Sequence, residues 1–134
     1  MNWIVANMKW VMLVSGALTF TMIYAAIAPQ AALRSTFGEA LDGPLAEIVV
    51  RNWGALVALV GAMLIYGAFS PASRPLVLTV AGISKLVFIG LVLNYGAQFL
   101  GQQVGVAIWV DLAMVVLFVV YLIRWGQFRS PARR

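Results

Sequence analysis

Four long apolar segments constrain this chain more than any other feature of its sequence. They run approximately over residues 9–28, 44–69, 76–99 and 104–125. Each is close to the ~20 residues that a helix needs to cross a hydrocarbon core of ~30 Å. Lipid offers no partner to open backbone groups, and these segments do not alternate in the way that barrel strands must. We therefore predict an all-α membrane protein, a four-helix transmembrane bundle that forms one domain over residues 1–134.

Composition supports lipid as the solvent and excludes several kinds of chemistry. Of the 134 residues, 63% are hydrophobic and only 10% are charged, whereas soluble domains carry about a quarter charged residues. The chain has no cysteine and no histidine. Disulfides, iron–sulfur clusters, His-ligated haem and the usual imidazole proton shuttle are therefore excluded. We expect no metal site and no cofactor.

Prolines mark the boundaries of the first two segments. Pro29 ends the first, and Asp42-Gly43-Pro44 forms a turn that places a proline at the first helical position of the second. The first segment could also be a signal peptide, because Ala26-Ile27-Ala28 resembles a cleavage site. Pro29 would hinder cleavage there, so an uncleaved first span is the prediction.

The distribution of cations predicts the orientation. Arginine and lysine favour the cytoplasmic side, and a basic patch beside a span indicates anionic headgroups rather than nucleic acid. We predict both termini in the cytoplasm, with residues 126–134 as a basic cytoplasmic tail. The alanine- and valine-rich spans and short loops suggest a bacterial inner membrane. The cations on the predicted cytoplasmic side are Lys9, Arg74, Arg124, Arg129, Arg133 and Arg134.

The longest connection, from Gln30 to Ile48, lies on the predicted outer side. Leu33, Phe37 and Leu41 recur there at four-residue spacing, which is typical of an amphipathic helix lying on the membrane or capping the bundle. An ordinary ordered loop is the alternative. Tryptophans near the predicted span ends indicate an aromatic belt; they are Trp3, Trp10, Trp53, Trp109 and Trp125.

Two charged residues fall deep inside predicted spans. Lys85 lies roughly 14 Å into the third span and Asp111 roughly 10 Å into the fourth, from opposite faces. An unpaired charge at such depth costs at least about 2.5–3.5 kcal/mol. We therefore predict that Lys85 and Asp111 form an intramembrane ion pair or meet across a hydrated cavity, with Arg51 as an alternative partner for Asp111.

Further polar residues suggest one pocket open to the outer side. Such a pocket would bind a lipid headgroup, a quinone-like ligand or a transported ion. In the alternative interpretation, the ion pair only fixes helix register and Arg51 reaches the interface. The candidate cluster comprises Arg51, Asn52, Lys85, Asn94, Gln98 and Asp111.

Small residues recur at close spacing in the second and third segments. This spacing lets helix backbones approach closely. Packing inside the bundle is predicted in preference to a dimer interface. The candidate packing residues are Gly54, Ala58, Gly61, Ala62, Gly82 and Gly90.

The sequence from Arg51 onward resembles a known type of four-span protein. The shared features are Arg51 followed by Gly54, a short polar turn from Ser70 to Pro75, and Tyr95-Gly96 closing the third span. In these it is similar to the scaffold protein of the ergosterol C-4 demethylation complex and to related bacterial four-span proteins. The first span and the outer loop align poorly, and Lys85 has no clear counterpart. The resemblance implies a non-catalytic tether for membrane enzymes.

Two functions are compatible with these features. The first is a non-catalytic membrane subunit or adaptor, whose partners are the bilayer, other membrane subunits or further copies of itself, and possibly a bound lipid. The alternative is a small homodimeric transporter or channel that uses Lys85 and Asp111. An enzyme is not predicted, because no catalytic set of residues is present.

Overall fold

The computed structural model describes residues 3 and 6–132, and side chains as far as residue 126. Helices α2 (Met8–Phe20) and α3 (Ile23–Ile27) form the first span. Helix α4 (Pro29–Phe37) precedes the long α5 (Pro44–Ala68). The short helix η1 (Pro71–Ser73) leads into α6 (Arg74–Tyr95), and η2 (Ala97–Phe99) leads into α7 (Gln103–Ala132). Over the described residues the fold is helical without strands, as predicted.

Four stretches have the length and hydropathy of membrane spans. They are Met8–Ile27, Pro44–Ala68, Pro71–Tyr95 and Gln103–Gly126, each within a few residues of the predicted boundaries. Helix α7 continues beyond the fourth span, through the basic tail as far as Ala132. Arg133 and Arg134 lie outside the described residues, as does the side chain of Arg129.

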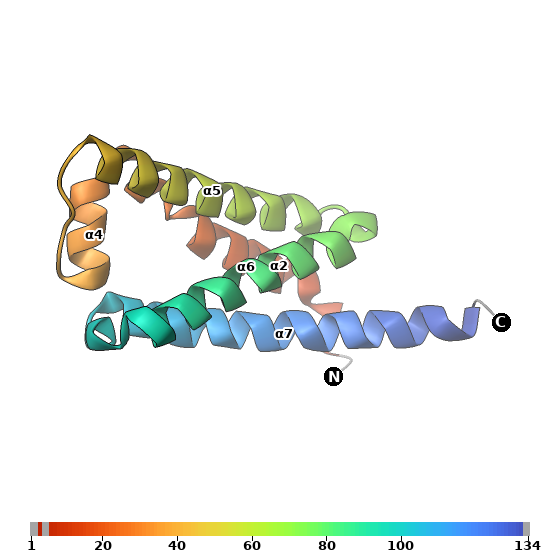
Figure 1. Ribbon diagram of the computed structural model, residues 1–134. Coiled ribbons are helices and arrows are strands. Elements are labelled where there is room, and N and C mark those ends of the chain that lie inside the picture. Colours follow the sequence, from red (N-terminus) through yellow and green to blue (C-terminus); the bar gives the residue numbers. More distant parts are fainter. Residues whose placement is uncertain (1–2, 4–5, 133–134) are drawn as a thin grey trace.

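The helices associate as two pairs (Figure 1). Helices α2 and α3 lie along α5, and α6 lies along α7, with a smaller contact between α5 and α6. At one end, where Lys9, Arg74 and Arg124 lie, residues from all four spans share one core that includes Met12, Leu64, Leu78 and Phe118. We call this the basic end. Helix α4 occupies the opposite end in Figure 1.

At the α4 end the core divides into two parts. Ala25, Leu33 and Val50 form one cluster of α3, α4 and α5, whereas Ile89 and Ile108 belong to a second cluster of α6 and α7. Helix α4 lies across this end in Figure 1 and contacts α3, α5 and α7. It therefore joins the two helix pairs where their own cores are separate.

Phe37, the last residue of α4, is the side chain common to both clusters. Its ring lies 6.3 Å from that of Trp53 on α5 and 5.4 Å, edge-on, from that of Phe99 in η2. Trp53 in turn stacks on Phe88 of α6 at 6.5 Å. Trp53 is partly buried in this aromatic cluster.

Local sequence explains the shape of α4. Ala28 precedes a proline and leaves the helical region (φ −131°, ψ 72°), which ends α3 and lets Pro29 begin α4. Gly38 ends α4 with φ +82°, a left-handed conformation that glycine adopts without strain. The amphipathic helix, rather than an ordinary loop, is therefore present. Leu33 is buried as its spacing requires, but Leu41 lies beyond the helix and is exposed.

Candidate functional site

The intramembrane ion pair is formed directly. The Lys85 Nζ lies 2.9 Å from the Asp111 Oδ1, and the two side chains are 7% and 19% exposed. Lys85 belongs to the buried stripe of α6, with Ala81 one turn before it and Ile89 one turn after it. Because α6 packs on α7, this stripe faces Asp111. Charges that a bilayer would penalise are thus paired inside the protein.

A third member of this cluster was not anticipated. The Lys85 ammonium also donates to the Thr19 hydroxyl of α2 at 3.1 Å, and Thr19 is buried. The bond links the α6–α7 pair to the first span. Thr19 lies one turn after Ser15 on the buried face of α2, and that pair of hydroxyl residues on one face was the available sequence signal.

Arg51 does not join the ion pair. Its guanidinium donates to the carbonyl oxygens of Ala26 (2.7 Å) and Ile27 (3.4 Å), and it contacts the Glu47 carboxylate at 3.4 Å. Ala26 and Ile27 are at the end of α3, where carbonyls lack helical partners and the helix dipole is negative. Arg51 therefore caps α3, and its predicted alternative role as the partner of Asp111 is wrong.

Arg74 makes an equivalent cap at the basic end. Its Nε and Nη2 donate to the carbonyls of Gly67 (3.0 Å) and Ala68 (2.7 Å), the last residues of α5. Arg74 is one of the cations on the predicted cytoplasmic side, and it also caps α5 where the chain turns into α6.

Loss of this cap has a measurable cost. Arg74→Gln is expected to lower the free energy of unfolding by about 1–2 kcal/mol. Hydrogen bonds to charged groups contribute about 1.5–3 kcal/mol, and the loss is smaller here because Arg74 is only partly buried. The measurement is the unfolding midpoint in mixed detergent and SDS micelles. Arg34→Gln is the matched control, since Arg34 is an exposed arginine for which the described structure shows no side-chain hydrogen bond. Equal losses in both variants would contradict the capping role.

The predicted six-residue pocket is not assembled. Asn52, Asn94 and Gln98 are all exposed. The Asn94 amide donates to the Gly90 carbonyl of its own helix at 2.9 Å. Only Lys85 and Asp111, of the six, meet each other through their side chains. Asn52, Asn94 and Gln98 lie where periodicity alone could not distinguish an outward-facing from an inward-facing position.

Gly54, Ala58 and Gly61 of α5 pack inside the bundle as predicted. A Cβ at Gly54 would stand within 2.6–2.8 Å of Met22, Ala25 and Ala26, and Ala58 is buried. Gly61 faces the backbone of α2 at Gly16, and a Cβ on either glycine would lie 2.7 Å from the carbonyl oxygen of the other. Gly16 is the counterpart that the sequence analysis missed.

The other three predicted packing residues do not pack inside the bundle. Ala62 is exposed, and a Cβ at Gly82 or at Gly90 would meet nothing within 4 Å. Both glycines of α6 lie outside its buried stripe, and Leu86, midway between them, is half exposed. They have no packing role within the described chain.

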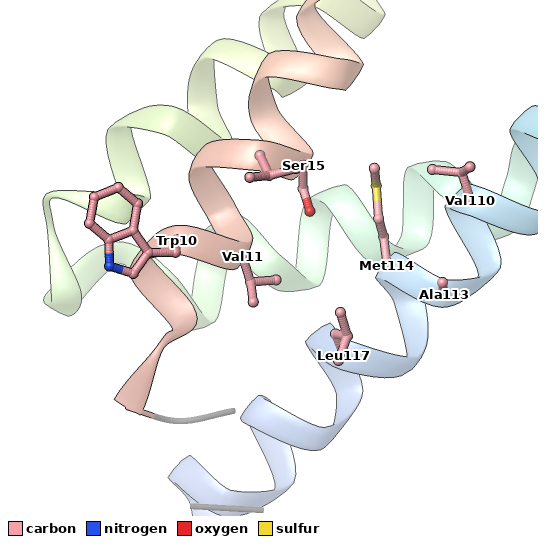
Figure 2. Close-up of a pocket in the computed structure, with 8 residues that line it drawn as sticks. Trp10, Val11, Ser15, Val110, Ala113, Met114 and Leu117 are labelled. Atoms are coloured by element: carbon pink, nitrogen blue, oxygen red, sulfur yellow. The ribbon is translucent and has the colours of Figure 1, made fainter. Parts of the chain in front are cut away.

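An apolar groove of about 440 Å³ lies between α2 and α7 (Figure 2). Figure 2 shows Val11 and Ser15 of α2 facing Met114 and Leu117 of α7 across it. Trp10 lies at its edge toward the basic end, and Ser15 is one turn from Thr19. The complete lining is Trp10, Val11, Val14, Ser15, Val110, Ala113, Met114 and Leu117.

The fold and these sites define a four-span helical membrane protein with an internally neutralised charge pair. Comparisons of the chain with family models, with curated proteins and with solved structures find no match.

Proposed function

We propose that this chain is a small non-catalytic subunit or adaptor of a larger membrane complex. The observation that carries the proposal is the outward face of α6. Gly82 and Gly90 lie eight residues apart there, with no neighbour within 4 Å of a Cβ. Glycine destabilises a helix by about 1 kcal/mol relative to alanine. In membranes, helices commonly use glycine where their backbones approach another helix closely. A transmembrane helix of another subunit fits this face.

The engagement of the polar groups supports this function over transport. The Lys85 ammonium bonds to both Asp111 and Thr19, and the arginines at positions 51 and 74 cap helices of the same chain. These groups stabilise the bundle. The groove beside them is lined almost entirely by apolar side chains, which suits hydrocarbon rather than a hydrated ion. The same role follows by analogy from the resemblance to the four-span scaffold of ergosterol C-4 demethylation.

The location belongs to the same proposal. We place the protein in a bacterial inner membrane, with the basic end and both termini in the cytoplasm. The support is the positive-inside rule. The acidic residues of the connections, Glu39, Asp42 and Glu47, all lie at the α4 end, opposite the basic end.

The test is purification of the tagged protein from its native membrane in a gentle detergent, with mass spectrometry of the proteins that accompany it. We expect a larger membrane protein in stoichiometric amount. Gly82→Leu and Gly90→Leu should remove that partner at least tenfold while the chain itself still accumulates. Leu91→Phe, on another part of the exposed surface of α6, is the control and should retain it. A chain recovered alone or only with its own copies would contradict the adaptor function.

A further inference from the structure

We propose that the groove between α2 and α7 is a binding site for one acyl chain of an anionic phospholipid, whose headgroup is held at the basic end. This inference does not depend on the adaptor function, which concerns the face of α6. It rests on the shape of the groove, on its chemistry along its length and on the charge at its end.

The groove is elongated along α7. Its α7 wall runs from Val110 to Leu117, about 10 Å at 1.5 Å per residue. Its lining is almost entirely apolar, so the occupant of this length of the groove is hydrocarbon.

The lining changes from apolar to interfacial along the groove. Val14, Val110 and Met114 form the inner part, near the middle of the spans. Trp10 stands at the edge and is the third residue of the first span, where amphipathic rings prefer the headgroup level. A molecule with an apolar tail and a polar head therefore fits this groove in one direction, with its head beyond Trp10.

Both walls carry a cation at that end. Lys9 precedes Trp10, and its ammonium lies 4.9 Å from the centre of the Phe69 ring, directly after α5, and 5.8 Å from that of Trp10. Arg124 is seven residues, two turns, beyond Leu117 and so lies on the same side of α7 as the groove. Within the described residues neither forms an ion pair, because the two ion pairs there are Arg51–Glu47 and Lys85–Asp111.

The charge of the whole basic end points to an anion. Three described cations, Lys9, Arg74 and Arg124, lie there, and none of the described carboxylates does. A cluster of this kind near the bilayer attracts anionic lipids, and each cation raises their affinity several-fold. Arg74 is engaged in capping α5, so Lys9 and Arg124 are the described cations at this end that remain for an anion.

Quenching of Trp10 fluorescence by brominated lipids tests the site. The protein is reconstituted in phosphatidylcholine vesicles that contain increasing amounts of brominated phosphatidylglycerol or brominated phosphatidylcholine. The Trp10 signal is the difference between the wild-type chain and Trp10→Phe. We expect brominated phosphatidylglycerol to reach half-maximal quenching at a roughly tenfold lower fraction than brominated phosphatidylcholine.

Two sets of variants separate the groove from general lipid contact. Ala113→Phe fills the groove and should abolish the preference, whereas Val119→Phe, on an exposed part of α7 outside the groove, should retain it. Lys9→Gln with Arg124→Gln should reduce the tenfold preference to less than twofold. Equal quenching by the two lipids in the wild-type protein, or a preference that survives Ala113→Phe, would overturn the proposal. So would a second copy of the chain covering the groove, seen as a dimer in which neither lipid quenches Trp10.

Discussion

Replacing Asp111 with alanine should cost about 3–5 kcal/mol of unfolding free energy, which would leave little of the stability of a chain this small. The variant leaves the ammonium of the buried residue Lys85 within the spans, with Thr19 as its remaining described partner. A hydroxyl accepts a hydrogen bond but supplies no charge. The measurement is the SDS-induced unfolding curve in mixed micelles, followed by circular dichroism.

The double variant Lys85→Met with Asp111→Leu distinguishes lost attraction from an orphaned charge. Replacing a buried ion pair by apolar side chains of similar size is often neutral or stabilising. We therefore expect the double variant to unfold within about 1 kcal/mol of the wild-type protein. Glu47→Gln, which removes the carboxylate of the half-exposed pair with Arg51, is the control and should change little. A double variant as unstable as Asp111→Ala would show that the attraction between Lys85 and Asp111 stabilises the bundle. The instability of Asp111→Ala would then not be explained by the unpaired charge alone.

The second large effect is expected at Gly61. A Cβ there would collide with the backbone of Phe20 and lie 2.7 Å from the Gly16 carbonyl oxygen. Backbone cannot rotate away as a side chain can, so Gly61→Ala must separate α2 from α5. Overpacking of this kind costs about 1–3 kcal/mol, and more where the neighbour is rigid.

Two other glycines of the spans provide the matched control for Gly61→Ala. In Gly82→Ala and Gly90→Ala the added methyl group meets nothing within 4 Å, and alanine has the better helix propensity. In the isolated protein these variants should be as stable as the wild type or slightly more so. If Gly61→Ala unfolds at the same SDS fraction as Gly82→Ala, the close approach of α2 and α5 is wrong.

Hydropathy was sufficient to predict the number, type and approximate bounds of the spans. Each span must be apolar over its whole length, so the signal is strong and does not depend on the neighbours. The pairing of Lys85 with Asp111 was predictable for a related reason. Two opposite charges at similar depth in lipid have few possible partners other than each other.

The sequence could not predict which side of each span faces the bundle and which side faces lipid. In a soluble helix the polar face marks the surface, but lipid-facing and buried positions of a span are both apolar, so periodicity is weak. Gly61 and Gly82 are both glycines among apolar sequence neighbours. A Cβ at Gly61 would collide with backbone, whereas a Cβ at Gly82 would meet nothing within 4 Å. The same ambiguity placed Asn94 in a pocket that it does not line and hid the role of Thr19.

The position of α4 has a consequence for the order of assembly. Phe37 packs against Phe99, which the ribosome synthesises 62 residues later. The contacts of α4 with η2 and α7 can therefore form only after both segments have been synthesised. Leu33 can pack earlier, because its cluster consists of residues of α3, α4 and α5. The α4 end is thus completed in two steps, first against α3 and α5 and later against the α6–α7 pair.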